Sequence, residues 1–282
     1  MANIAFLGTG LLGGAFAEAC AKRGDTVTAW NRSADKVLAL GQFGVKAAKT
    51  PAEAVKGAAR VHLVLKDDAV VEEVIAAARP GLAADAVLID HTTTLPALTA
   101  ERSKRLNAEG LKYLHCPVFM MPQAARNAQG SMLAAGPKAL FESVKADLAR
   151  MTGRLEFLGE RADLAAANKL LGNAMIIGMS STMADVLTLA RASGVAGEDA
   201  IKLLGLFDVN AMIATRGLNM AEGDFTPRFE LAMARKDVRL MLETAGARPM
   251  AALPSIAARM DQLIAAGHGA KDASVVGIDA VQ

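Results

Sequence analysis

Lys169 and Asn173 form the polar pair best suited to chemistry in the second half of the sequence. They are four residues apart in an otherwise apolar stretch, a spacing that places both on one face of a helix. A lysine there is costly to desolvate unless it is paired or used. It can act as a general acid that gives a proton to a carbonyl oxygen, with Asn173 holding the substrate oxygen or the lysine. The pattern equally fits a surface lysine whose stem lies along apolar residues.

A glycine-rich segment near the start of the chain predicts a site for a dinucleotide. An apolar run precedes Gly8, Gly10 and Gly13, and an amphipathic stretch and a second apolar run follow. This order of strand, GxGxxG, helix and strand is the context that the motif requires. Gly8 permits the tight turn, Gly10 lets the backbone approach a pyrophosphate, and Gly13 lets helix and strand pack closely. The predicted cofactor contacts in this turn are Gly8, Thr9, Gly10, Leu11, Leu12 and Gly13.

The residues after the second apolar run indicate which nicotinamide cofactor is bound. NAD sites usually carry Asp or Glu there, which accepts a hydrogen bond from the ribose 2′-hydroxyl. This chain has Asn31 and Arg32, followed by Ser33 and Lys36. A guanidinium can bind a 2′-phosphate through two charge-assisted hydrogen bonds, whereas a carboxylate repels it. These four residues therefore predict NADP(H); the alternative is that Arg32 is a solvated turn residue.

Further apolar runs alternate with helical stretches up to about residue 118. This alternation predicts a mostly parallel, doubly wound sheet. Ligands of such sheets bind beyond the carboxyl ends of the strands. Leu65, Lys66 and Thr93 follow predicted strands, so we expect them to contact the cofactor.

From about residue 163 the sequence becomes helical throughout. Residues 163–192 read as one long helix rich in Ala, Leu and Met, and no convincing strand follows residue 158. Further helices are predicted over 197–206, 209–221, 230–246 and 252–266. We therefore expect an α/β fold: a Rossmann-like NADP-binding domain over 1–162 and an all-α substrate and dimerisation domain over 163–282. The long helix is more apolar than a solvated connector, which predicts a homodimer or homotetramer.

The composition argues against several classes of protein. The chain has 282 residues, a net charge of +2 and no basic tract, so a nucleic-acid partner is not expected. Two cysteines and four histidines (His62, His91, His115 and His268) show neither a disulfide framework nor metal-ligand spacing, so no metal is expected. No uninterrupted apolar run reaches the roughly 18 residues of a membrane span, and no charged leader precedes the first strand. We therefore expect a cytoplasmic protein with no membrane partner.

Segments along essentially the whole chain resemble the β-hydroxyacid dehydrogenase family, which includes 3-hydroxyisobutyrate dehydrogenase and tartronate semialdehyde or glyoxylate reductases. These segments are 6–13, 30–33, 90–93, 116–118, Lys169 with Asn173, Lys236–Asp237, 267–269 and Asp272. The resemblance implies an enzyme in which Lys169 is the catalytic acid/base and Asn173 contacts the substrate. It also places Thr93 and Lys236 against the cofactor and implies a dimer, or dimer of dimers, across the long helix. By pattern alone, Lys236 and Asp237 are ordinary charges of an amphipathic helix.

The segment after Pro117 departs from that family. The family has Ser-Gly-Gly there, which binds the substrate carboxylate, whereas this chain has Phe119, Met120 and Met121. The replacement removes a donor and fills the space of a carboxylate, so we expect these three residues to contact an apolar or larger substrate. This segment is similar to imine reductases, a sister group that usually has Asp or Tyr where this chain has Lys169.

Three functions follow from these patterns. The leading hypothesis is an NADP(H)-dependent oxidoreductase that interconverts an aldehyde or ketone and its alcohol, with Lys169 as general acid/base. The first alternative is an NADPH-dependent imine reductase in which Lys169 orients the substrate or a water molecule. The second is a non-catalytic NADP-binding protein that has lost its substrate site, against which the retention of Lys169, Asn173 and Lys236 argues.

Overall fold

The computed structural model describes residues 2–281. It divides into two compact units, Met1–Asn173 and Ala174–Gln282. The division falls inside helix α8, Leu164–Ala192, which is the predicted long helix. The assignment of cofactor binding to 1–162 and of substrate binding and dimerisation to 163–282 stays a prediction.

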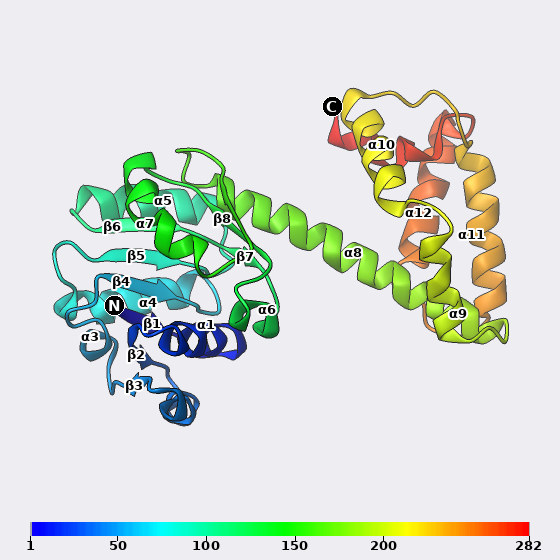
Figure 1. Cartoon of the computed structure of the whole chain (residues 1–282). Coiled ribbons are helices and arrows are strands. Elements are labelled where there is room, and N and C mark those ends of the chain that lie inside the picture. Colours follow the sequence, from blue (N-terminus) through cyan, green and yellow to red (C-terminus); the bar gives the residue numbers. More distant parts are fainter. Residues whose placement is uncertain (1, 282) are drawn as a thin grey trace. The chain divides into compact units, whose positions relative to one another are not determined.

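A six-stranded parallel sheet forms the centre of unit 1, in the order β3-β2-β1-β4-β5-β6 (Figure 1). The strands are β1 Asn3–Leu7, β2 Thr26–Trp30, β3 Lys46–Ala47, β4 Arg60–Leu63, β5 Val87–Asp90 and β6 Lys112–His115. The predicted doubly wound parallel sheet is confirmed. The direction of winding reverses between β1 and β4, and this switch point is where ligands bind in folds of this kind.

Helices cover both faces of this sheet, because alternate residues of its strands point to opposite sides. They are α1 Leu11–Lys22, α2 Ala34–Leu38, α3 Pro51–Ala54, α4 Asp68–Ala78, α5 Pro96–Ala108, α6 Pro122–Arg126 and α7 Lys138–Ala149, with short 3-10 turns η1 Ala39–Phe43 and η2 Arg79–Gly81. Phe6 of β1 shares a core with Phe16 of α1 and Phe141 of α7. The next residue, Leu7, belongs to the opposite core with Val71 of α4.

A second, three-stranded sheet was not predicted from the sequence. It consists of β7 Val118–Phe119, β8 Ser131–Ala134 and β9 Arg154–Phe157. Strand β7 is antiparallel to β8, and β8 is parallel to β9. The last of the apolar runs expected up to about residue 118 is divided between the two sheets, because β6 ends at His115 and the chain enters the other sheet after Pro117. Because proline lacks a backbone N–H, it suits such a transition between sheets.

Two buried histidines join neighbouring parts of unit 1. His91 Nδ1 lies 2.6 Å from the carbonyl oxygen of Cys116, which fixes Nδ1 as a donor. Its Nε2 then accepts from His62 Nδ1 at 2.9 Å. Burial lowers the pKa of His91 to about 4 and the pKa of His62 well below its usual value. Both rings are therefore neutral at neutral pH, and they tie β4 and β5 to the segment that leads into β7.

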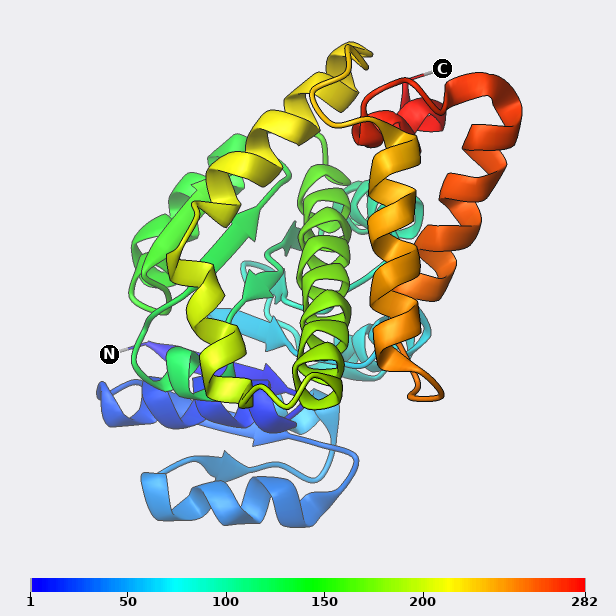
Figure 2. The ribbon, with the colours of Figure 1, turned by 90° about the vertical axis from the view of Figure 1, so that its right-hand side faces the viewer.

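Unit 2 is helical, as predicted. Besides the end of α8 it contains α9 Gly197–Lys202, η3 Leu203–Gly205, α10 Val209–Glu222, α11 Leu231–Ala245, α12 Leu253–Leu263, η4 Ile264–His268 and η5 Ala273–Ala280. Helices α11 and α12 lie side by side (Figure 2) and share a core that includes Leu231, Val238 and Met260. The buried carboxylate of Asp185 in α8 accepts hydrogen bonds from the backbone of Ala251, Ala252 and Leu253, at the start of α12.

The part of α8 in unit 2 carries unusually exposed apolar side chains. Met175, Ile176, Ile177 and Met179 are each about half exposed or more. By length and composition alone, α8 meets the criterion for a membrane-spanning helix, which the sequence analysis did not expect. That expectation counted only uninterrupted apolar runs, whereas α8 reaches the criterion through Ala, Leu, Ile and Met spread among polar residues. Asp185 in the same helix is buried against α12, so part of α8 is committed to the protein interior.

Candidate cofactor and catalytic site

The turn between β1 and α1 is built from three glycines with different requirements. Gly8 has φ +99°, and a methyl group there would lie within 3.0 Å of the Val64 carbonyl oxygen. A methyl group at Gly13 would come equally close to the Gly8 carbonyl oxygen, so only glycine lets α1 start this near the turn. Gly10, by contrast, has nothing within 4 Å of the position of a methyl group. The turn thus offers an open backbone surface at Gly10, the form that a pyrophosphate needs.

Asn31 fastens this turn to the end of β2. Its Oδ1 accepts a hydrogen bond from Thr9 N at 3.0 Å, and its Nδ2 donates to the Ser33 carbonyl oxygen at 3.1 Å. Asn31, one of the two residues that stand in place of the acid of an NAD site, is thus occupied within the fold, whereas, within the described chain, Arg32 is not. Thr9 is buried, and its hydroxyl has no hydrogen-bond partner in the described chain. An unpartnered hydroxyl at this turn is consistent with a polar ligand that completes it.

A crevice of ≈ 370 Å³ opens at the switch point of the sheet. The predicted cofactor residues that line it are Gly8, Gly10, Asn31, Arg32, Ser33, Lys36, Leu65 and Lys66. Arg32, Lys36 and Lys66 are exposed there. Lys66 pairs with Asp67 at 3.5 Å, whereas within residues 2–281 no carboxylate forms an ion pair with Arg32 or Lys36. Ser33 directly precedes α2, and its hydroxyl makes no capping bond. This donor set fits a phosphate at the end of β2.

A network of hydrogen bonds supports the crevice where the chain leaves β4 and β5. The backbone N–H of Leu65 donates to Thr92 Oγ1 at 3.1 Å, and Thr92 N donates to Asp90 Oδ1 at 2.9 Å. Asp90 also accepts from the Tyr113 hydroxyl at 2.8 Å. Arg102 lies against this pair, 3.7 Å from the Asp90 carboxylate, and is almost fully buried. The network fixes the ends of β4 and β5 relative to each other, a function that the sequence analysis missed because its members are far apart in the chain.

Six of the predicted cofactor residues are outside the crevice lining. Thr9 and Gly13 are buried in the turn beneath it, while Leu11 is 85% exposed and Leu12 is partly buried on α1. Thr93 is exposed just after β5. The remaining predicted residue, Lys236, lies in unit 2 on α11, where its Nζ is 2.9 Å from Asp237. The roles of Thr93 and Lys236 stay predictions.

Lys169 and Asn173 meet on the first turns of α8, as their spacing predicted. Lys169 Nζ donates to Asn173 Oδ1 at 3.0 Å and lies 4.1 Å from the centre of the Phe119 ring. Burial lowers the pKa of Lys169, and it is the one cause of the shift. The third polar residue of this stretch, Asn168, donates instead to the Leu164 carbonyl oxygen at 2.8 Å. The half-buried ammonium therefore has one hydrogen-bonding side-chain partner and one aromatic neighbour.

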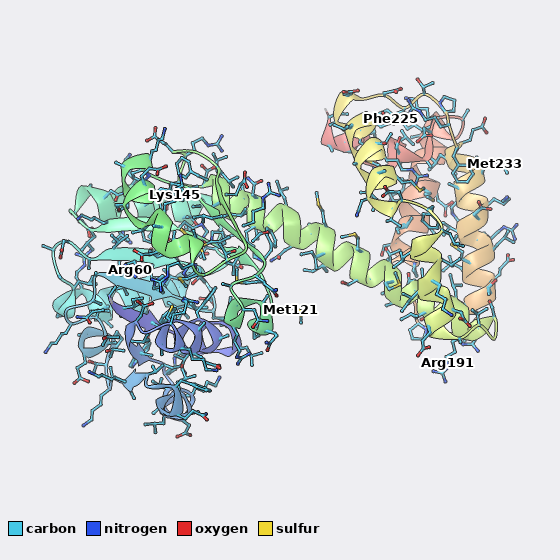
Figure 3. All side chains as sticks on the ribbon, viewed as in Figure 1. Arg60, Met121, Lys145, Arg191, Phe225 and Met233 are labelled. Atoms are coloured by element: carbon cyan, nitrogen blue, oxygen red, sulfur yellow. The ribbon has the colours of Figure 1, made fainter. Side chains whose placement is uncertain are left out.

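Two glycines that the sequence analysis overlooked make room for Phe119 and Met120. A methyl group at Gly172 would lie within 3.0 Å of two Phe119 ring carbons. Gly130 has φ +82°, and a methyl group there would lie 2.7 Å from Met120 Cβ. Met121, the third residue of the segment, is 76% exposed at the surface of unit 1 (Figure 3). Of these three residues, Phe119 is the one whose ring lies against the Lys169 ammonium in the described chain.

No three His, Cys, Asp or Glu side chains gather as a metal site in the portion of the chain that the structure describes. His115 is buried, and its Nε2 lies 2.9 Å from the Thr92 carbonyl oxygen. Together with His62 and His91, it forms part of the sheet's interior. The histidines that are dispersed in the sequence are thus partly clustered in the fold, although not as metal ligands.

Family models match both halves of the chain. Residues 3–159 match the model described as the NAD binding domain of 6-phosphogluconate dehydrogenase. Residues 164–277 match the model described as NAD-binding of NADP-dependent 3-hydroxyisobutyrate dehydrogenase. The first model covers more than half of the chain and contains the glycine turn and the crevice.

Curated relatives show similar identities but differ in length. The chain is 28% identical over 244 residues to the cytokine-like nuclear factor N-PAC of Xenopus tropicalis, which covers 85% of this chain and 46% of that protein. The chain thus spans about half the length of the first curated relatives that it matches. It is also 28% identical over 288 residues to glyoxylate/succinic semialdehyde reductase 1 of Arabidopsis thaliana, covering 99% and 98% of the two chains.

Solved structures share the fold. An imine reductase from Myxococcus stipitatus in complex with NADP+ has a TM-score of 0.86 at 21% identity, covering 97% of this chain and 98% of that chain. A reductive aminase from Aspergillus terreus, in complex with NADPH4, cyclohexanone and allyl amine, has a TM-score of 0.88 at 23% identity, covering 100% and 99%. At these identities the likeness establishes the fold.

Proposed function

The chain belongs to the 6-phosphogluconate and 3-hydroxyisobutyrate dehydrogenase family, and from that premise we propose that it is an NADP(H)-dependent oxidoreductase. Its reaction interconverts an aldehyde or ketone and the corresponding alcohol. When bound, the reduced nicotinamide supplies a hydride to the carbonyl carbon. The family models and the crevice of unit 1 support the cofactor, and the surroundings of Lys169 support the reaction.

The cofactor is NADP(H), held by the crevice of unit 1. The open backbone at Gly10 accepts the pyrophosphate, and Arg32, Ser33 and Lys36 hold the 2′-phosphate. The family model over residues 164–277, whose description names an NADP-dependent enzyme, supports the same choice. Thr93 and Lys236 complete the proposed cofactor contacts.

Lys169 is the general acid/base of the reaction. The observation that carries this role is a half-buried ammonium that donates to Asn173 and to no carboxylate within residues 2–281. Because burial lowers its pKa, this lysine releases a proton more readily than a solvated one. In reduction, Lys169 gives that proton to the carbonyl oxygen as the hydride arrives, and in oxidation it takes the proton back. Asn173 holds the amine in place and contacts the substrate.

The substrate is an apolar carbonyl compound, or one larger than a short hydroxy acid. Phe119, Met120 and Met121 stand where the family binds a carboxylate, and they offer no hydrogen-bond donor from their side chains. Apolar side chains with few polar groups favour substrates of matching polarity. We assign the three residues to the substrate side of the site.

The test is NADPH oxidation with a substrate panel. The panel contains glyoxylate, succinic semialdehyde, apolar aldehydes of increasing length, and cyclic imines. We expect turnover of apolar aldehydes to exceed that of glyoxylate. Turnover of imines without turnover of any aldehyde would overturn the carbonyl assignment. Tight NADPH binding with no turnover across the panel would instead favour a non-catalytic protein.

Imine reduction is the second candidate function. It is favoured by the apolar Phe119 to Met121 segment, because an imine lacks the carboxylate that the family motif binds. It is disfavoured by the cationic Lys169, because a protonated imine beside an ammonium is repelled. The aldehyde and imine arms of the same panel separate the two functions.

We further propose that a second copy of the chain covers the exposed apolar residues of α8. Met175, Ile176, Ile177 and Met179 form an apolar surface of a kind that proteins usually bury. We expect a dimer, or a dimer of dimers, by size-exclusion chromatography with light scattering. Ile177→Glu, which adds a charge to this surface, is expected to shift the protein toward monomer, whereas Lys145→Glu on the exposed side of α7 is not. A wild-type monomer at micromolar concentration would contradict the proposal.

A further inference from the structure

Phe119 and Lys169 come from different elements of unit 1, and the ammonium of Lys169 lies over the ring of Phe119. The ring belongs to β7, and the amine belongs to the first half of α8. Lys169 Nζ lies 4.1 Å from the centre of the ring, well inside the distance at which a cation is attracted to an aromatic face. In the sequence these residues are fifty positions apart, and no motif links them.

Gly172 makes this approach possible. It lies one helical turn after Lys169, on the same side of α8. A methyl group at Gly172 would come within 3.0 Å of the Cζ and Cε1 atoms of Phe119. The tip of the ring therefore rests against the helix backbone, and any larger residue at 172 would displace it. Phe119, Lys169 and Gly172 form one packing unit, which we call the lysine seat.

We propose that Phe119 is a positioning residue that holds the ammonium of Lys169 over its ring, and that Gly172 is the glycine this arrangement requires. The proposal rests on the role of Lys169 as general acid/base and adds the group that aims it. Position 119 is therefore more than a replacement for a carboxylate-binding serine. Its ring contacts the catalytic amine itself.

The seat determines how many donors the amine has left. An ammonium group has three N–H donors. One donates to Asn173 Oδ1 at 3.0 Å, and the nitrogen also lies 4.1 Å from the centre of the Phe119 ring. A substrate oxygen can then take the remaining donor, which fixes the direction of proton transfer. Asn173 and Phe119 thus act as two supports for the same nitrogen.

The electrostatic effect of the ring opposes that of burial. Burial favours the neutral amine, and no charged group of α8 or of the elements packed on it contributes to the shift of the Lys169 pKa. The face of an aromatic ring favours the cation. Asp163, six residues before Lys169 in the chain, pairs with Arg161 at 2.7 Å. Removing only the aromatic face should therefore lower the pKa of Lys169 further.

The experiment measures the ionisation of Lys169 directly. The rate of acetylation of Lys169 by acetic anhydride is followed from pH 6 to 11 by mass spectrometry in the protein with NADPH absent. In Phe119→Leu, which keeps most of the apolar volume, we expect the midpoint to fall by about half a unit to one unit. Phe119→Tyr retains the ring and should keep the wild-type midpoint. Met121→Leu, in the same segment but exposed, is the matched control and should also leave it unchanged.

A second variant tests the seat from the helix side. Gly172→Ala should displace the ring and lower the midpoint in the same direction as Phe119→Leu. NADPH binding, which we assign to the glycine turn and the crevice residues, should stay within about twofold of wild type and shows that each variant is folded. A Phe119→Leu midpoint equal to or above that of wild type overturns the proposal. Because acetylation needs no substrate, this outcome is distinguishable from a failure of Lys169 to act in catalysis, which turnover by Lys169 variants reports.

Discussion

The cofactor crevice and the lysine seat both lie in unit 1, but they are specified in different ways. The crevice is built mainly from residues that follow β1, β2 and β4. Its predicted phosphate-binding groups come from two short segments, 8–13 and 31–36. The lysine seat needs Phe119 from a small separate sheet and Lys169, Asn173 and Gly172 from α8. A local motif defines the first region, and a long-range contact defines the second.

This difference has a physical basis. The glycine turn must satisfy backbone constraints within a few residues, so its residue types are fixed by local geometry. The lysine seat depends on the position that β7 gives to Phe119 after Pro117. It also depends on which side of α8 faces the Phe119 ring. The crevice is therefore expected to be sensitive to backbone changes. The seat should be sensitive to the shape and charge of single side chains.

The largest effect on turnover is expected from substitution of Lys169, which tests the lysine seat. Lys169→Met preserves the length of the side chain but removes the proton donor, so kcat/KM should fall by about 10²- to 10⁴-fold. Lys169→Arg keeps the charge but cannot release a proton, and it should lose a similar amount. Both variants should bind NADPH nearly as wild type does, measured by cofactor fluorescence. Retained turnover in Lys169→Arg would show that only a positive charge is needed there.

The next effect separates two glycines of the same turn. Gly13→Ala would force a methyl group against the Gly8 carbonyl oxygen, so we expect unfolding stability to fall by about 1–3 kcal/mol. Gly10→Ala has open space around the new methyl group, so stability should change little. That methyl group narrows the surface offered to the pyrophosphate, and the Kd for NADPH should rise by about tenfold or more. Urea denaturation and cofactor titration measure the two effects; equal stability losses in both variants would refute this division of roles.

Arg32 tests the specificity of the crevice. Arg32→Asp replaces a cation with an acid at the end of β2, where no carboxylate pairs with the native side chain within residues 2–281. We expect the Kd for NADPH to rise by about 10- to 100-fold, while the Kd for NADH changes little or improves. Lys46→Asp, in exposed β3, provides a control for the change of charge. An equal loss of both cofactors in Arg32→Asp would argue that Arg32 does not read the 2′-phosphate.

The smallest effect at neutral pH concerns the buried histidine pair, which ties β4 and β5 to the segment that leads into β7. His62 and His91 have lowered pKa values when folded, so the unfolded chain binds more protons as the pH falls below about 6.5. Their contribution to stability is fully present above that pH and is lost as the pH falls toward their lowered folded-state pKa values, which is about 4 for His91. Below pH 6.5 we expect a loss of about 1 kcal/mol per pH unit for each imidazole, with little change between pH 7.5 and 6.5, measured by urea denaturation between pH 7.5 and 5.

His268 is the control for this pH dependence, because it lies in unit 2 and is only partly buried. His268→Gln should retain the wild-type slope, whereas His91→Gln should reduce it. A slope in His91→Gln that matches wild type would show that other groups cause the acid sensitivity.

The sequence by itself determined the parallel sheet, the glycine turn, the course of the helices in unit 2 and the helical pairing of Lys169 with Asn173. Each depends on a periodicity or a spacing that acts over a few residues. Only the tertiary structure decided that Phe119 lies over Lys169, that Gly172 makes room for it, and that Asp90, Tyr113 and Arg102 brace the crevice. These contacts join residues far apart in the chain, and their partners are selected by how sheets and helices pack rather than by any local preference of the backbone.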